Sequence, residues 1–437
     1  MQTNAPLNYF YRKGRHLMKF HRTAFPPHIK IYLMGWIVYF IGYFGRYNYS
    51  ASMIAIGQAE GFQKSELGLI ASIVFLTYGF GQLLSGWLGD RLNPKVMICI
   101  GTIGLTLSNV LMGLSRSLFQ MQLIWGMNGL FSAMIWAPMI RLLTACMPKE
   151  QLKKAVLSFS YATSFGQTGT YLLSSYLVSH FSWRMAFLVP AALCFLSTLG
   201  WVVISFTAKT TDPVQPVVQD KPSVNNVIQN QKEKMKFRSV YLFSGLPLIL
   251  LSILFMGMLK DGIVTWVPQM ITDQFHTDAG LSIFLSSILP LVNSLSVWIV
   301  TRVSRKHESD DMRNATVIFL GAAVAMLVLI FTQTIHPLLS ILLFSIISTF
   351  ITGANAILIS YVPLHFTSSG RTSTIAGITN AFTYLGSALS GWGFGWLATA
   401  HGWNIVNWLL LILCLAGCVI CLAARPFWNR FVQKASE

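Results

Sequence analysis

Long apolar stretches recur along the whole chain and are separated by short polar turns. Each is long enough to cross a bilayer as a helix, which takes about 20 apolar residues. None shows the period-two alternation of a membrane β-strand. We therefore predict spanning helices at residues 31–58, 67–89, 96–115, 117–140, 155–181, 185–207, 239–270, 279–301, 314–335, 337–363, 372–399 and 402–424.

One polar interruption divides these twelve predicted helices into two groups of six. Residues 208–238 are rich in Pro, Gln and charged residues and have no apolar periodicity, which is typical of a flexible or surface-lying linker. The sequence therefore predicts an all-α membrane protein of twelve transmembrane helices, with six-helix halves at 31–207 and 239–424. We expect the N-terminal tail, 1–30, and the C-terminal tail, 425–437, to lie in the cytoplasm with the linker.

The two predicted halves resemble each other in sequence. Gly166 precedes Trp183 by the same 17 residues by which Gly386 precedes Trp403. Such matching offsets suggest duplicated, pseudo-symmetric halves, which usually enclose a substrate site between them near the middle of the membrane.

The charge balance indicates how the chain lies in a phospholipid bilayer. It has 31 Lys and Arg against 14 Asp and Glu, a formal net charge of +17, yet only 10% of its residues are charged. An ordinary soluble domain has about 25% charged residues, so that class is excluded. Basic loop residues mark the cytoplasmic side, and with the N-terminal tail inside, only Lys64, Arg116 and Arg184 fall in outside loops. We therefore expect both termini in the cytoplasm and no nucleic-acid partner.

Three basic residues, Arg46, Arg141 and Lys260, fall within or at the edge of the predicted spans. An ionised side chain at a helix centre costs about 2.5–3.5 kcal/mol on insertion scales, so each needs a reason. Arg141 lies near the cytoplasmic end of its span, but Arg46 and Lys260 lie deep, one in each half. Arginine binds phosphate or carboxylate through a planar fork, and lysine acts as a movable point charge. We therefore predict that this pair binds an anionic substrate.

Asp261 is the only acidic residue within a predicted span. Adjacent residues of a regular helix point in different directions, which would leave Lys260 available for a ligand and turn Asp261 toward another helix. Unwinding at Gly262 would let them pair, and the sequence leaves both arrangements open. So few intramembrane carboxylates disfavour a proton-driven carrier. Two uncompensated cations would also oppose closure around a site without an anion, which favours exchange over net leakage.

Aromatic residues crowd the two cations, and tyrosine hydroxyls can donate to anion oxygens. Tyr39 and Tyr43 lie on the Arg46 side of the first span, and Trp266 follows Lys260. The chain has no evident Ser-His-Asp set, P-loop or cluster of metal ligands, and its cysteines lie in apolar runs. We therefore expect a protein that is not an enzyme and that has no cofactor or bound metal.

The segment GWLGDRLNPKV, from Gly86 to Val96, resembles the gating signature of the major facilitator superfamily between its second and third helices. By that resemblance Asp90 braces a cytoplasmic gate, and we assign gating or conformational roles to Asp90, Arg91, Arg141 and Asp261. More closely, GYFGRYNYSASM, WAPMIR, LKDGIVTWVP and AGITNAFTYLGSALSGW resemble the organophosphate:phosphate antiporter family. That family includes carriers of glycerol 3-phosphate and hexose phosphates.

This resemblance implies a set of substrate-binding residues. Arg46 and Lys260 match its two phosphate-binding positions, and the tyrosines match positions that line its cavity. The implied set is Arg46, Lys260, Tyr39, Tyr43, Tyr78, Gln82, Thr163, Trp266 and Tyr384. This chain departs from the family pattern at four positions. The family often has Lys, Lys, His and Glu where this chain has Tyr47, Gln82, Thr163 and Ser286. They make the expected cavity less cationic and leave the substrate open.

Together these observations predict a monomeric transporter of organic anions in a bacterial inner membrane. We expect it to exchange a phosphate ester for inorganic phosphate by alternating access. One alternative is a proton-coupled symporter of carboxylates or sugar acids, since related anion:cation symporters also have an Arg-x-Asn element in their first segment, which Arg46-Tyr47-Asn48 resembles. A second alternative is a membrane sensor that binds sugar phosphates with little flux.

Overall fold

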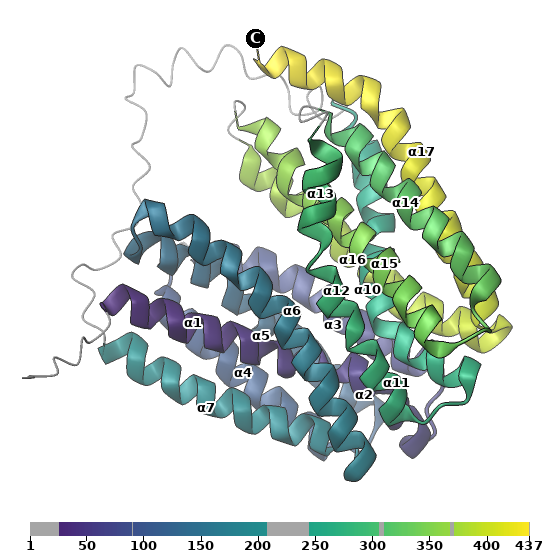
Figure 1. Cartoon of the computed structure of the whole chain (residues 1–437). Helices are drawn as coiled ribbons and strands as arrows, with labels where there is room; N and C mark the ends of the chain where they lie inside the picture. Colours follow the sequence, from purple (N-terminus) through teal and green to yellow (C-terminus); the bar gives the residue numbers. More distant parts are fainter. Residues whose placement is uncertain (1–25, 90, 208–243, 306–309, 368–370, 437) are drawn as a thin grey trace, which may run out of the picture.

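The computed structural model describes residues 26–89, 91–207, 244–305, 310–367 and 371–436. Within these ranges the chain folds into a bundle of helices in two groups that lie side by side (Figure 1). Residues 1–25 of the predicted N-terminal tail and the whole predicted linker lie outside the described residues.

The first half contains seven helical pieces. They are α1 (Pro27–Phe44), α2 (Asn48–Glu60), α3 (Lys64–Gly89), α4 (Pro94–Leu114), α5 (Leu118–Cys146), α6 (Lys149–His180) and α7 (Met185–Thr207). The short break between α1 and α2 falls inside the first predicted span, so this half has six spanning segments.

The second half also has six spanning segments, but they are divided into more helical pieces. It contains α10 (Leu246–Phe275), α11 (Ala279–Ser286), α12 (Ile288–Asn293), α13 (Ser296–Ser304), α14 (Asp311–Thr332), α15 (Pro337–Asn355), η2 (Ala356–Tyr361), η3 (Val362–Phe366), α16 (Thr372–His401) and α17 (Trp403–Ser436). The three pieces α11 to α13 form one segment, and α15, η2 and η3 form another. The predicted all-α fold of twelve spanning segments is therefore confirmed.

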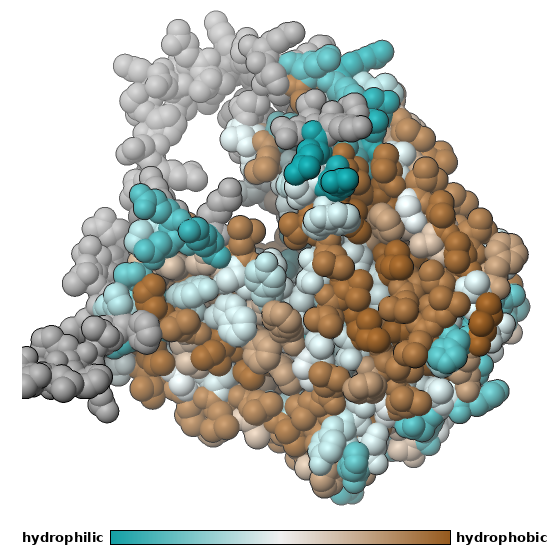
Figure 2. Space-filling model, in the orientation of Figure 1, coloured by the Kyte–Doolittle hydropathy of each residue, from teal (hydrophilic) through white to brown (hydrophobic). Residues whose placement is uncertain are grey.

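The surface of the bundle matches a protein embedded in lipid. In Figure 2 apolar side chains cover the middle of the visible face, and polar side chains gather toward its ends. Among the described residues, nine helical stretches are long and apolar enough to cross a membrane. The segments that fall short are α1 with α2, α6 and α16. All three segments contribute residues to the cavity described below.

The C-terminal tail predicted to begin at residue 425 is helical and continuous with α17, which runs to Ser436. Arg425 forms an ion pair of 2.7 Å with Asp310. Trp428 is fully buried, and its ring packs against His365 and Phe366 at the end of the tenth segment. These contacts extend the helix beyond the apolar run that marked its end in the sequence.

The two halves are joined at one end of the bundle, which we call the closed end. There Lys64 Nζ of α3 lies 2.7 Å from Asp273 Oδ2 of α10, and Trp403 Nε1 donates to the same oxygen at 2.7 Å. Nearby, Ser175 of α6 donates to the carbonyl oxygen of Gly280 at 2.7 Å. Toward the opposite end, where α1 and α16 begin, the halves diverge (Figure 1).

Small residues allow α3 and α16 to approach closely between the halves. A Cβ on Gly68 would lie 2.3 Å from the carbonyl oxygen of Gly391, and one on Gly395 would lie 2.5 Å from that of Lys64. Ser72 Oγ accepts a hydrogen bond of 2.7 Å from the backbone N–H of Trp392. These glycines therefore allow close contact between the two halves of one chain.

We expect Gly391→Ala to shift the protein away from the arrangement in which the closed end is shut. Overpacking costs about 1–3 kcal/mol, and the added methyl group would meet Ser72 Oγ of the first half at 2.7 Å only in that arrangement. Distances between spin labels at Gln58 and His276, one in each half, should therefore lengthen in a larger fraction of molecules. The control is Gly393→Ala, because a Cβ there meets nothing within 4 Å. Equal distance distributions for both variants would contradict this expectation.

Candidate functional site

A cavity of about 860 Å³ lies between the two halves. Its walls come from α1, α3, α5 and α6 in the first half and from α10, α12, α13, α15, η2 and α16 in the second. Both deep cations of the sequence, Arg46 and Lys260, line it. A site with one cation from each half is the arrangement expected of duplicated halves around a shared substrate.

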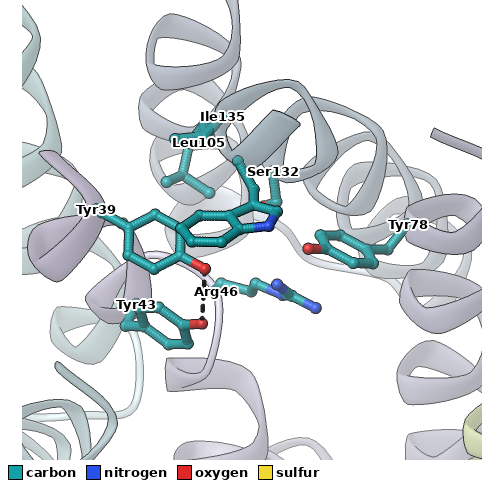
Figure 3. Close-up of a pocket in the computed structure, with 9 residues that line it drawn as sticks. Tyr39, Tyr43, Arg46, Tyr78, Leu105, Ser132 and Ile135 are labelled. Carbon is teal, nitrogen blue, oxygen red and sulfur yellow. Dashed lines mark hydrogen bonds between the residues drawn. The ribbon is translucent and has the colours of Figure 1, made fainter. Parts of the chain in front are cut away.

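Arg46 lies in the break of the first spanning segment. Its guanidinium carbon is 3.6 Å from the centroid of the Tyr78 ring and 5.4 Å from that of the neighbouring Tyr47 ring. Figure 3 shows the side chain extending between Tyr43 and Tyr78. Within the described part of the chain, no carboxylate forms an ion pair with Arg46. The charge is therefore held by aromatic faces, and its N–H groups remain available to an anion.

Tyrosine hydroxyls surround this cation. Tyr39 and Tyr43 share a hydrogen bond of 3.3 Å between their hydroxyl groups (Figure 3). The Tyr78 hydroxyl accepts a hydrogen bond of 2.9 Å from Gln82 Nε2, and its ring packs edge-on against Tyr384 at 4.8 Å between centroids. All five residues line the cavity. They bring together hydroxyl and amide groups that can donate to the oxygens of an anion.

Lys260 is paired within its own helix. Its Nζ donates to Asp261 Oδ1 at 2.7 Å, and Asp261 Oδ2 accepts a hydrogen bond of 2.5 Å from Ser387 Oγ of α16. The helix is continuous through Gly262, so the pair forms without the unwinding that the sequence analysis considered. The flexible four-carbon stem of lysine makes this possible.

This pair corrects the expectation of two uncompensated cations. Asp261 is buried, with 4% of its surface exposed, and it neutralises Lys260. Arg46 alone has no carboxylate partner among the described residues. The charged side chains of the cavity therefore sum to one positive charge, and an anion that engages Lys260 must compete with Asp261.

Trp266 does not line this cavity, so the prediction that it contacts substrate is not supported by its position. It is fully buried, and its Nε1 donates to the carbonyl oxygens of Ser390 and Gly391 at 3.3 and 3.2 Å. Its ring also packs against Trp403. These contacts join α10 to α16 and α17 near the closed end.

The remaining predicted residues lie in different places. Gln82 and Thr163 line the cavity, whereas Asp90 lies outside the described residues. The Arg91 guanidinium lies 4.1 Å from the centroid of the Trp87 ring. Arg141 donates to the carbonyl oxygen of Leu92 at 3.3 Å, which ties α5 to the turn between α3 and α4. Their gating roles stay predictions.

The structure adds polar residues of the second half that the sequence analysis missed. Asn293, Thr352, Asn355 and Asn380 all line the cavity. Asn355 directly precedes the π-helix η2, a form of helix that occurs frequently at functional sites. Isolated polar residues in apolar helices form no motif, so only their rarity in the spans could have drawn attention to them. They could hydrogen-bond the uncharged part of a substrate whose anionic group lies at Arg46 and Lys260.

Comparisons with known proteins agree with this architecture. Residues 35–391 match the Major Facilitator Superfamily. A probable hexose phosphate transport protein of Chlamydia pneumoniae is 24% identical over 421 residues, covering 92% of this chain and 91% of that protein. A glycerol-3-phosphate transporter of Bacillus subtilis (strain 168) is 25% identical over 426 residues, covering 92% of this chain and 93% of that protein.

A solved structure supports the same fold. The crystal structure of a D-xylose-proton symporter superposes with a TM-score of 0.70 and 14% sequence identity, covering 91% of this chain and 97% of that one. At this level of identity the likeness concerns the arrangement of the helices alone. The charged and aromatic side chains of the cavity are the features that bear on the substrate.

Proposed function

The chain belongs to the Major Facilitator Superfamily, and from this premise we propose that it exchanges a phosphate ester for inorganic phosphate across a membrane by alternating access. The observation that carries the proposal is Arg46, a guanidinium without a carboxylate partner among the described residues, in a cavity that also contains Lys260. The two relatives named above support it, because their names describe transport of hexose phosphate and of glycerol 3-phosphate.

The geometry suggests how binding would promote exchange. Phosphate oxygens accept the planar fork of Arg46 in the first half and draw the flexible Lys260 away from Asp261 in the second. The anion then bridges the halves and favours their approach around it. Opening of the other side requires the Lys64–Asp273 pair at the closed end to separate.

We place the protein in a bacterial inner membrane with both termini in the cytoplasm. The excess of basic residues in the loops on the side of the N-terminal tail supports this orientation, and the relatives are bacterial. The cavity would then open toward the cytoplasm in this structure. Because one chain contains all of the cavity walls described above, we propose that the monomer is the transporting unit.

One observation favours a second candidate, a proton-coupled symporter of carboxylates or sugar acids. Asp261 compensates the charge of Lys260, so reorientation without a bound anion is opposed by fewer uncompensated charges than the sequence suggested. That arrangement would permit net uptake coupled to another ion. Exchange is still favoured because Arg46 has no such partner among the described side chains.

Uptake of labelled inorganic phosphate into proteoliposomes distinguishes these functions. We expect uptake to require phosphate or a phosphate ester inside the vesicles and to persist in the presence of an uncoupler. Uptake of carboxylates or sugar acids that needs no internal anion and collapses with the uncoupler would replace exchange by symport. Saturable binding of a phosphate ester without flux would indicate a sensor.

A further inference from the structure

The break in the first spanning segment needs a structural cause. Helical structure stops at Phe44 and resumes at Asn48, with no proline between them. A helix interrupted inside a membrane leaves backbone carbonyl groups without their usual N–H partners, and these must find other donors. The carbonyl group of Gly45 is in this position, one residue before Arg46.

Two side-chain amides from other helices hold the Gly45 carbonyl oxygen. Asn109 Nδ2 of α4 donates to it at 2.7 Å, and Asn128 Nδ2 of α5 donates to it at 2.9 Å. Asn48, the first residue of α2, donates to Asn109 Oδ1 at 2.7 Å and to the carbonyl oxygen of Ala186 at 2.9 Å. The three asparagine side chains are fully buried, and none lines the cavity.

The fit around this carbonyl group is tight. A Cβ on Gly45 would lie 3.0 Å from Asn109 Nδ2 and 3.0 Å from Cys194 Sγ. Asn109 Nδ2 also donates to the carbonyl oxygen of Leu105 at 2.8 Å, and Asn128 Nδ2 also donates to Ser108 Oγ at 3.0 Å. The Asn109 amide is therefore fixed by its own helix and the Asn128 amide by Ser108 of α4, and the backbone at Gly45 is fixed in turn.

We propose that Asn48, Asn109 and Asn128 are positioning residues that hold the break open and direct Arg46 into the cavity. A carbonyl oxygen has two lone pairs, and the two amides occupy both at Gly45. That oxygen therefore does not compete for the adjacent guanidinium, which stays available to an anion. The inference rests on the proposed function only in that it takes phosphate as the ligand of Arg46.

The test compares Asn109→Leu with Asn407→Leu in the full-length purified protein. Asn407 is also a fully buried asparagine, but it lies in α17 and donates to Gln333 Oε1 at 2.6 Å. Two quantities are measured: the Kd for inorganic phosphate, and the rate at which phenylglyoxal modifies Arg46, followed by peptide mass spectrometry. Thermal unfolding shows that each variant is folded.

We expect Asn109→Leu to raise the Kd for phosphate about ten-fold. It should also slow modification of Arg46 at least three-fold, because the lone pair that Asn109 leaves free on the Gly45 carbonyl oxygen then accepts a hydrogen bond from the guanidinium, while Asn128 keeps the other. Asn407→Leu should change neither quantity, although it lowers the unfolding temperature. Equal values of both quantities in the two variants would overturn the positioning role.

The modification rate separates this inference from the proposed function. If the wild-type protein does not bind phosphate, the proposed function fails, but the rate at Arg46 still tests the asparagines. A slower rate in Asn109→Leu alone would support their positioning role, and an unchanged rate would overturn it. If Asn109→Leu does not fold, Asn128→Leu is measured in the same way against the same control.

Discussion

Arg46→Ala is expected to reduce phosphate exchange in proteoliposomes to the background level. Arg46 is the one cation of the cavity that no described carboxylate neutralises, and the fork of an arginine binds phosphate bidentately. Removing one partner of a buried, hydrogen-bonded charge pair costs about 2–5 kcal/mol, which is roughly a 30- to 4,000-fold loss of affinity. The cavity of this variant would have no net positive charge with which to attract an anion.

Two further variants make this result specific. Arg46→Lys keeps the charge but loses the fork, so we expect it to retain a small part of the exchange activity. Arg430→Ala removes an exposed arginine of α17 that lies outside the cavity, and it should exchange phosphate at the wild-type rate. Exchange by Arg46→Ala at half of the wild-type rate or more would remove Arg46 from the binding site.

Lys260→Ala is expected to be the second most damaging substitution, for a reason that involves its neighbour. In this variant the buried Asp261 would keep its hydrogen bond from Ser387 but lose Lys260, its cationic partner. Removing one of the two charged residues of a buried ion pair destabilises a protein by about 3–5 kcal/mol. The uncompensated carboxylate would also repel phosphate, so both the unfolding temperature and the affinity for phosphate should fall.

The double variant Lys260→Ala/Asp261→Ala tests that reason. Because it removes both charges, we expect it to regain most of the lost thermal stability and part of the phosphate affinity, through Arg46 alone. As a control, Arg184→Ala removes the partner of Glu60, an ion pair outside the cavity; it should leave the Kd for phosphate unchanged. A double variant as impaired in binding as Lys260→Ala would show that Asp261 is not the cause.

The sequence was sufficient to locate the two deep cations because charge within an apolar span is rare and has a known energetic cost. It was also sufficient for the number of spans, since length and hydropathy determine where helices can cross a bilayer. Trp266 lies outside the cavity for a geometric reason. Six residues along a helix of 3.6 residues per turn place Trp266 on a different face from Lys260, against α16 rather than in the cavity.

Other features depended on tertiary contacts that no local pattern records. The segment around Gly45 contains no proline, and its break is held by amides of Asn109 and Asn128 from two other helices. The pairing of Lys260 with Asp261 depended on how far a flexible side chain reaches, which spacing alone does not determine. The polar cavity residues Asn293, Thr352, Asn355 and Asn380 were missed because single polar residues in long apolar helices match no motif.

The central claim is that Arg46 and Lys260, one from each half, form a single anion site. Calorimetric titration of inorganic phosphate into the purified protein tests it most directly. We predict one saturable site per chain in the wild-type protein and no measurable binding heat in the folded double variant Arg46→Ala/Lys260→Ala. Equal affinity and stoichiometry in the two proteins would place the phosphate site elsewhere and contradict the account.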